Sequence, residues 1–290
     1  YLSNDGNATG STVIGYGAGA SIDSGDNYNV FIGHQVADAN MTNATNNVGV
    51  GYQSLSALTT GDNNVAIGYQ AMLAYTGTGG ENTVIGRSAG DALLTGGDNV
   101  FVGFGSGGAT TAASSLTIIG SGAGAGVLTT AANGTVLIGT GAGAALTSGA
   151  GNTAIGYQSL DALTSSGQNT ALGYGTLGTL VDGDQNTAIG YNAMTSGTHT
   201  SFNFNTVVGA NAGDAFTSVA IEHVTVLGAN AAGGALTDGA NGTIAIGSSA
   251  LAALTSGGRN TAIGFEALST ATVLTHNIAI GYNALKDSSA

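Results

Sequence analysis

The sequence contains no cysteine and no proline, and only three of its 290 residues carry a positive charge. Without cysteine the chain forms neither disulfide bonds nor thiolate metal sites, so its stability has to come from packing. The absence of proline is typical of a chain in which nearly every backbone N–H group takes part in a hydrogen-bonded ladder. No apolar run is long enough to cross a bilayer as a helix, so direct membrane insertion is not expected.

The few charges that are present are mostly negative. Sixteen acidic residues stand against Arg87, Arg259 and Lys286, which gives a formal net charge of −13. Nucleic acids and anionic membranes bind to basic surfaces, so neither is expected as a partner. The apolar content of 42% is too high for a disordered chain.

The sequence does contain a repeat, whose clearest copy is Asn-Thr-Ala-Ile-Gly-Tyr-Gln-Ser-Leu at residues 152–160. Its glycine recurs at intervals of 17 to 19 residues along the chain. The glycines are Gly15, Gly33, Gly51, Gly68, Gly86, Gly103, Gly120, Gly139, Gly156, Gly173, Gly190, Gly209, Gly228, Gly247, Gly264 and Gly281. Self-similarity at so constrained a period is typical of a solenoid. The sequence therefore predicts an all-β fold, a parallel β-solenoid of about 16 coils of 17–19 residues, forming a single domain over residues 1–290.

Each coil is expected to contain two short strands. The residue three before the glycine is β-branched and the residue one before it is Ile, Val or Leu, as in Thr153 and Ile155. Side chains two positions apart share one face of a strand, so these two columns are expected to form the core. Because the threonines share the face assigned to the core, they are expected to be buried, which argues against an ice-binding role for them. The position between them, usually Ala or Val, would then lie on an opposite face that is apolar enough to be covered as well. A second apolar stretch after the glycine, such as Leu160 to Leu163, predicts the second strand.

Asparagine stands four residues before the glycine in most copies. Stacked in successive coils, these amides are expected to hydrogen-bond to one another or to turn backbone and so fix the register. The members of this predicted ladder are Asn29, Asn47, Asn64, Asn82, Asn99, Asn152, Asn169, Asn186, Asn205, Asn260 and Asn277.

The repeat at residues 152–160 and its copies resemble the repeats of the YadA-like head of trimeric autotransporter adhesins. They are still more similar to the Asn-Thr-Ala-Ile-Gly-Tyr-x-Ala-Leu repeats of phage and bacterial fibre proteins that often end in an endosialidase-type chaperone. The resemblance covers the whole chain. It implies a left-handed β-roll, three chains side by side, and a location outside the cell, on a cell surface or a virion.

No enzymatic activity and no cofactor are expected. Residues 103–108 match the G-x-G-x-x-G pattern of dinucleotide sites, but similar glycines occur at the same corner of other coils and no helix follows. Asp182, Asp184 and Asn186 have the oxygen spacing of a calcium loop, yet they lack its central glycine and its distal glutamate. Turn formation is the expected role of these three residues, and calcium is the alternative.

Two functions remain. The first is a structural subunit of an extracellular or virion fibre, a stiff rod that self-associates side by side as a homotrimer or head to tail through uncapped ends. The second is an adhesin or phage receptor-binding fibre that recognises a cell-surface glycan or protein. Its candidate interaction patch is a group of unusual side chains that interrupt the repeat, where exposed rings would favour binding and buried rings would favour assembly. The patch consists of His199, Phe202, Phe204, Phe216, Glu222 and His223.

Overall fold

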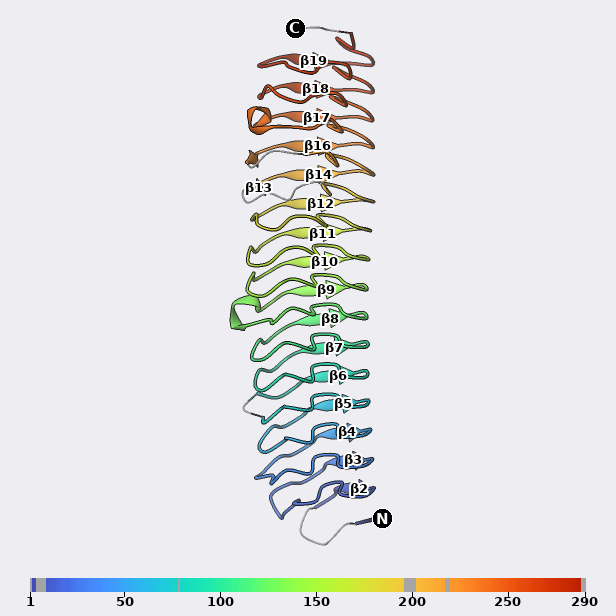
Figure 1. The fold of residues 1–290 in the computed structure, drawn as a ribbon, viewed down its shortest axis with the longest axis vertical. Helices are drawn as coiled ribbons and strands as arrows, with labels where there is room; N and C mark the ends of the chain where they lie inside the picture. Colours follow the sequence, from blue (N-terminus) through green and yellow to red (C-terminus); the bar gives the residue numbers. More distant parts are fainter. Residues whose placement is uncertain (1, 4–8, 78, 196–201, 217–219, 288–290) are drawn as a thin grey trace. The chain divides into compact units, whose positions relative to one another are not determined.

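Short parallel strands, one in most of the coils, are stacked along the chain (Figure 1). The computed structural model describes residues 2–3, 9–77, 79–195, 202–216 and 220–287. The structure divides into two compact units. Unit 1 comprises Tyr1–Gly141 and Leu146–Ser148, and unit 2 comprises Ala142–Ala145 and Gly149–Ala290. Both are built in the same way, and the predicted all-β parallel β-solenoid is confirmed.

In unit 1 the strands β2 to β9 pair in parallel, each with the strand of the next coil. The elements of this unit are β1 (Leu2–Ser3), β2 (Thr12–Ile14), β3 (Val30–Ile32), β4 (Val48–Val50), β5 (Val65–Ile67), β6 (Thr83–Ile85), β7 (Val100–Val102), β8 (Thr117–Ile119), the 3-10 helix η1 (Thr130–Ala132) and β9 (Val136–Ile138). The first strand, β1, pairs antiparallel with β2. The N-terminal edge of the stack, expected to be uncapped, is therefore covered by a segment of the chain itself.

Unit 2 repeats the arrangement with eight more parallel strands in its main sheet and a separate pair, β13 with β15. Its elements are β10 (Thr153–Ile155), β11 (Thr170–Leu172), β12 (Thr187–Ile189), β13 (Phe202–Asn203), β14 (Thr206–Val208), β15 (Ile221–Glu222), β16 (Thr225–Leu227), the 3-10 helix η2 (Asp238–Ala240), β17 (Ile244–Ile246), β18 (Thr261–Ile263) and β19 (Ile278–Ile280).

The repeated glycine ends each strand because no other residue fits there. These glycines have φ between +127° and +143°, a region that side chains of L-amino acids rarely adopt. A Cβ atom on Gly156 would lie 2.1 Å from the carbonyl oxygen of Gly173 in the next coil. The glycine therefore serves both the turn and the close stacking of coils.

The structure reverses the predicted inside and outside of the strand. In every three-residue strand the middle residue is the buried one, as Ala154 and Ala171 are, and the flanking side chains are partly or well exposed. The prediction that the β-branched and Ile/Val/Leu columns form the core is wrong. Parity correctly groups the residues that share a face, but both faces are apolar, so parity alone does not tell which face is inside.

The core is completed by the side chain four residues after the glycine, and the two inward positions are complementary in size. Where the middle strand residue is Ala or Gly, this position is Leu or Met, as in the pair Ala171 and Leu177. Where the middle residue is larger, the position is Gly or Ala, as in Phe101 and Gly107. A Cβ atom on Gly107 would lie 2.9 Å from the Phe101 ring. Each coil thus has room for one large side chain from this pair.

A run of turns occupies the place of the expected second strand. After Gly156, for example, residues up to 162 are assigned as bends and turns, and Leu160 is buried with a left-handed φ of 51°. Leu177, with φ of 52°, repeats this geometry in the next coil. The apolar stretch therefore contributes to the core as predicted, but without strand pairing in these coils.

The asparagine column forms a buried ladder of side-chain amides within each unit. The Asn169 side chain donates to Asn152 Oδ1 at 3.2 Å and to the carbonyl oxygen of Gly183 at 2.7 Å. Its own Oδ1 accepts hydrogen bonds from the backbone and the side chain of Asn186, both at 3.0 Å. In unit 1 the ladder ends where Leu116 donates its backbone N–H to Asn99 Oδ1 at 3.0 Å. The amides satisfy buried polar groups and hold neighbouring coils in register.

Candidate assembly surface

Two columns of side chains cover the outer face of the stacked strands. The first column holds the residue three before each glycine and the second holds the residue one before it. Neither column, all of whose residues the structure describes, contains a charged side chain. Leu172 is 43% exposed and Leu227 is 49% exposed. Neighbouring residues of a column are separated by one strand spacing, about 4.8 Å.

The first column differs between the units. In unit 1 it is Thr12, Val30, Val48, Val65, Thr83, Val100, Thr117 and Val136. In unit 2 it is Thr153, Thr170, Thr187, Thr206, Thr225, Ile244, Thr261 and Ile278. The second column consists of Ile, Val or Leu throughout. Since these two columns lie outside, they form the apolar face that a neighbouring chain would cover. The argument that the threonines are buried, and therefore not available to ice, no longer holds.

Stacked rings run along one margin of the outer face, which we call the C-rim and define as the residue directly after each repeated glycine. In unit 1 the C-rim is Tyr16, His34, Tyr52, Tyr69, Arg87, Phe104, Ser121 and Thr140; in unit 2 it is Tyr157, Tyr174, Tyr191, Ala210, Ala229, Ser248, Phe265 and Tyr282. Adjacent rings such as Tyr157 and Tyr174 stack with centroids 5.0 Å apart. The Arg87 guanidinium lies 5.1 Å from the centroid of the Phe104 ring.

The opposite margin, the N-rim, is the residue five before each repeated glycine. In unit 1 it is Gly10, Tyr28, Asn46, Asn63, Glu81, Asp98, Ser115 and Gly134; in unit 2 it is Gly151, Gln168, Gln185, Phe204, His223, Gly242, Arg259 and His276. Its non-glycine residues all have a left-handed φ of 58–63°. Phe204 and His223 stack on each other with centroids 5.2 Å apart.

The structure does not bring the candidate interaction patch together as one surface. Phe202 and Phe216 are buried, with parallel rings 6.3 Å apart, so they belong to the core of unit 2. Phe204 and His223 are exposed on the N-rim. Glu222 is half-buried and accepts a hydrogen bond from the Asn203 amide at 3.1 Å. The sixth residue, His199, lies outside the described residues.

The three candidate calcium ligands are engaged with separate partners. Asp182 accepts a hydrogen bond from the Ser166 hydroxyl, and Asp184 accepts one from the backbone N–H of Gly167 at 2.7 Å. Asn186 belongs to the buried ladder. Over the described ranges of the chain, no group of three or more His, Asp or Glu side chains is placed to hold a metal ion.

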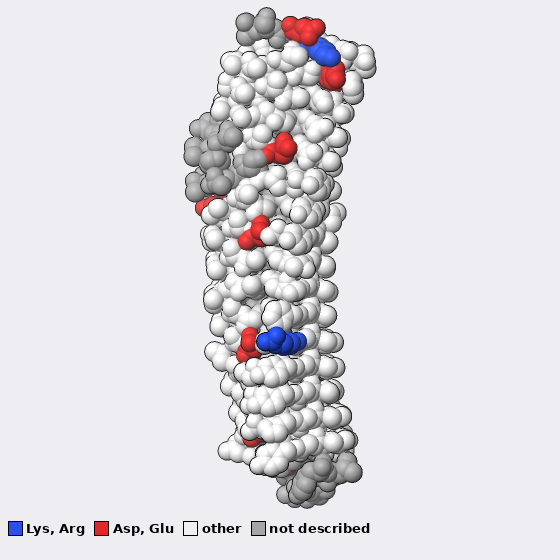
Figure 2. Space-filling model, turned by 45° about the vertical axis from the view of Figure 1, so that its right-hand side comes forward, with Lys and Arg blue, Asp and Glu red and all other residues white. Residues whose placement is uncertain are grey.

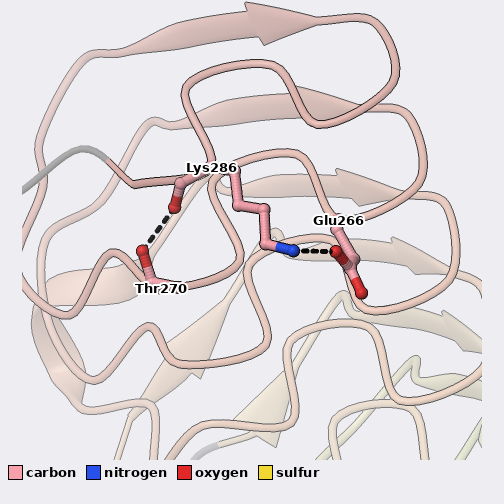
Figure 3. Close-up of polar contacts among 3 residues, drawn as sticks. All are labelled: Glu266, Thr270 and Lys286. Carbon is pink, nitrogen blue, oxygen red and sulfur yellow. Dashed lines mark hydrogen bonds and ion pairs between the residues drawn. The ribbon is translucent and has the colours of Figure 1, made fainter.

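Charged side chains are sparse on the face drawn in Figure 2. Near the C-terminal end the Lys286 ammonium pairs with Glu266, which raises the pKa of Lys286, and the Thr270 hydroxyl donates to the Lys286 carbonyl oxygen (Figure 3). Burial raises the pKa of Asp91 and Asp161, although backbone N–H groups donate to both. Each of the two carboxylates lies in a turn, Asp91 in unit 1 and Asp161 in unit 2.

Fold and surface together define a repeat protein of the β-solenoid class. No protein-family model matches the chain, and no curated protein or solved structure matches it either. None of the described helices has the length and apolar character needed to span a membrane. The similarity to adhesin heads and fibre repeats therefore remains a prediction from the sequence.

Proposed function

We propose that this protein is a structural subunit of an extracellular or virion fibre and that its copies associate side by side through the outer face. The observation that supports this most strongly is the face itself, in which two uncharged columns of mostly Ile, Val, Leu and Thr run over the strands of each unit. Apolar surface repeated in this way is rarely left in water by a soluble protein. Covering it with another chain removes this area from solvent.

A second copy of the chain is the partner that fits best. Side chains of a column repeat with the strand spacing, and only a surface with the same spacing meets every one of them equivalently. Another copy of the chain has the same strand spacing because it has the same fold. Its outer face is also uncharged, so the contact would leave no buried ion unpaired. The resemblance to trimeric fibre repeats favours the same arrangement.

Side-by-side association is favoured over head-to-tail association by the N-terminal edge. Strand β1 already pairs with β2, from Leu2 opposite Ile14 to Ser3 opposite Val13. A second copy added end to end would have to displace β1 before its last strand could pair with β2. The outer face needs no such rearrangement.

The mass of the purified chain in solution, measured by sedimentation over a range of concentrations, tests the proposal. We expect a discrete oligomer, and we expect Leu172→Asp to convert it to a monomer because the carboxylate would be buried in the contact. Leu94→Asp is the matched control, since Leu94 is 47% exposed in a turn away from the outer face. A wild-type chain that is monomeric at every concentration contradicts the proposal and leaves the face to water.

The adhesin function is a second candidate, supported by the exposed pair Phe204 and His223. Aromatic side chains on a surface with few charges suit a glycan or protein partner. Binding of immobilised cell-surface glycans that is lost in Phe204→Ala, with the oligomer unchanged, would support this function over a purely structural one.

A further inference from the structure

We infer that each unit contains a calcium site, in which the carboxylate of Asp91 in unit 1 or of Asp161 in unit 2 binds the ion together with backbone carbonyl oxygens of two neighbouring coils. The inference goes beyond the proposed fibre function, because each site lies within a single copy and does not depend on how copies associate. It starts from one position of the coil, the fifth residue after each repeated glycine.

Aspartate and glycine occur in pairs at this position. It is aspartate in four coils, at Asp38, Asp91, Asp161 and Asp214. It is glycine in three coils, each of which directly follows a coil with aspartate, at Gly108, Gly178 and Gly233. None of these three glycines has a left-handed φ, so the backbone does not require glycine there. Glycine instead leaves open the space that a Cβ atom would fill, beside the carboxylate of the preceding coil.

In unit 1 three oxygen atoms surround the open space at Gly108. The point that a Cβ atom on Gly108 would occupy lies 3.3 Å from Asp91 Oδ1. The same point lies 3.3 Å from the carbonyl oxygen of Gly105 and 3.5 Å from that of Ser88. Asp91 and Ser88 belong to one coil and Gly105 to the next. An ion bound at this point would therefore join two neighbouring coils.

Unit 2 repeats the arrangement at Gly178. The corresponding point lies 3.3 Å from Asp161 Oδ1 and 3.0 Å from the carbonyl oxygen of Gly175. The carbonyl oxygen of Gln158, in the coil of Asp161, is 3.3 Å away. In both units the ligands are thus one carboxylate, the carbonyl three residues before it and the carbonyl three residues before the glycine. Each site needs only one acidic side chain, because the backbone supplies the other oxygen atoms.

The oxygen atoms of each site leave a negative charge without compensation. A carboxylate and the negative ends of two carbonyl dipoles face one point, which is unfavourable unless positive charge lies there. Among the described residues, ion pairing is confined to Lys286 and Glu266. Burial raises the pKa of Asp91 and of Asp161, and only backbone N–H groups act against this shift. A bound cation would offset the unfavourable charge.

Calcium is the cation that fits these ligands. Ca²⁺ binds about six to eight oxygen atoms in flexible geometry and accepts carboxylate, carbonyl and water oxygens together. Asp91 and Asp161 are only half-buried, so water can complete the coordination. Mg²⁺ requires a nearly ideal octahedron, which oxygen atoms fixed on two separate coils do not readily provide. With one carboxylate in each site, we expect weak binding, with a dissociation constant of about 10⁻⁴–10⁻³ M.

Equilibrium dialysis against radioactive Ca²⁺, which counts the ions bound per chain, tests the inference. We expect Asp91→Asn and Gly108→Ala each to remove one bound ion, because the first removes the charge and the second fills the space with a methyl group. The double variant Asp91→Asn/Gly108→Ala should lose no more than either single variant, since both changes remove the same ion. Asp38→Asn is the matched control, because the coil after Asp38 has Ser56 in place of glycine.

The outcomes separate a built site from a general attraction of cations to an acidic chain. An equal loss of calcium in Asp38→Asn and Asp91→Asn would overturn the inference, as would a wild type that binds no calcium at millimolar concentration. A folded Gly108→Ala variant that keeps its ion would also overturn it. Circular dichroism establishes folding, and Asp161→Asn, which should also lose one ion, repeats the test in unit 2. None of these results bears on the oligomer, so the proposed function is tested separately.

Discussion

Units 1 and 2 have the same fold, but the large side chains of their cores come from different positions in the coil. In unit 1 most middle strand residues are large, including Phe31, Phe101 and Leu137, and the turn position opposite them is small. In unit 2 most are alanine, and the turn position is usually leucine or methionine, as in Leu160. The interior therefore constrains the combined volume of two positions and leaves open which one supplies it.

The outer faces of the two units differ as well. Valine predominates in the first column of unit 1 and threonine in that of unit 2, while the second column is alike in both. Valine and threonine have nearly the same shape, so this difference changes polarity without changing the contour of the face. If copies associate side by side as proposed, we expect their contact to be drier over unit 1.

Converting one coil type into the other should give the largest effect. Phe101→Ala removes the only large inward side chain of the pair Phe101 and Gly107, and we expect the free energy of unfolding to fall by about 3–5 kcal/mol. The double variant Phe101→Ala/Gly107→Leu should recover most of this loss, because leucine occupies the same left-handed turn position in other coils, for example Leu160 with φ of 51°. Urea titration measures all three proteins.

The control for that exchange is Gly107→Leu alone, which places a side chain against the Phe101 ring and should cost about 1–3 kcal/mol by overpacking. A double variant less stable than both single variants would show that the two positions do not share one volume.

The asparagine ladder is common to both units, so breaking it should have the same effect in each. Asn82→Ala and Asn169→Ala remove amides that are buried and bonded to the coils on both sides. Because buried N–H groups of the next coil lose their acceptor, each variant should lose about 1–3 kcal/mol of unfolding free energy. Unequal losses in urea titration, beyond experimental error, would show that register is held differently in the two units.

Unit 1 alone contains a buried tyrosine away from the C-rim. Burial raises the pKa of Tyr75 from 10.0 to about 12, although neighbouring amides such as that of Asn64 lower it. The fold therefore favours the neutral phenol, so this stabilisation is present below pH 10 and is lost as the pH rises from about 10 to about 12. Thermal unfolding of the whole chain across this range should be less pH-dependent in Tyr75→Phe than in the wild type; identical profiles would contradict the assignment.

Exchanging the residues of the outer column should have the smallest effect on folding. Thr170→Val in unit 2 and Val65→Thr in unit 1 alter half-exposed side chains, and each should change the free energy of unfolding by no more than about 0.5 kcal/mol. Self-association should respond in opposite directions, becoming stronger with Thr170→Val and weaker with Val65→Thr. Sedimentation would contradict the comparison if both variants changed affinity in the same direction.

The coil boundaries and the class of fold could be predicted because local chemistry fixes them. Only glycine fits the corner after each strand, and the asparagine amides stack at a constant place, so both leave a column in the sequence. The inner face could not be predicted from periodicity, because Ala154 and Ile155 are both apolar and differ mainly in size. The usable signal was the paired variation of size, as in Ala154 with Leu160 and Phe101 with Gly107.

The candidate patch shows a second limit. Phe202 and Phe216 interrupt the repeat as visibly as Phe204 and His223 do, yet the first pair is buried and the second exposed. A residue that departs from the repeat shows that its coil is unusual, but it does not show whether its side chain points into the core or toward solvent.

The left-handed turn residues have a consequence for the order in which the coils fold. Leu160, Leu177 and Leu251 hold a conformation that costs an isolated residue about 1–2 kcal/mol, and they keep it only because neighbouring coils fix the turn. A lone coil is thus unstable, whereas a coil that forms next to a folded coil is stabilised by hydrogen bonds and packing with that neighbour. We therefore expect folding to begin with a slow nucleation step and to continue by the fast addition of coils, so unfolding and refolding curves should show hysteresis.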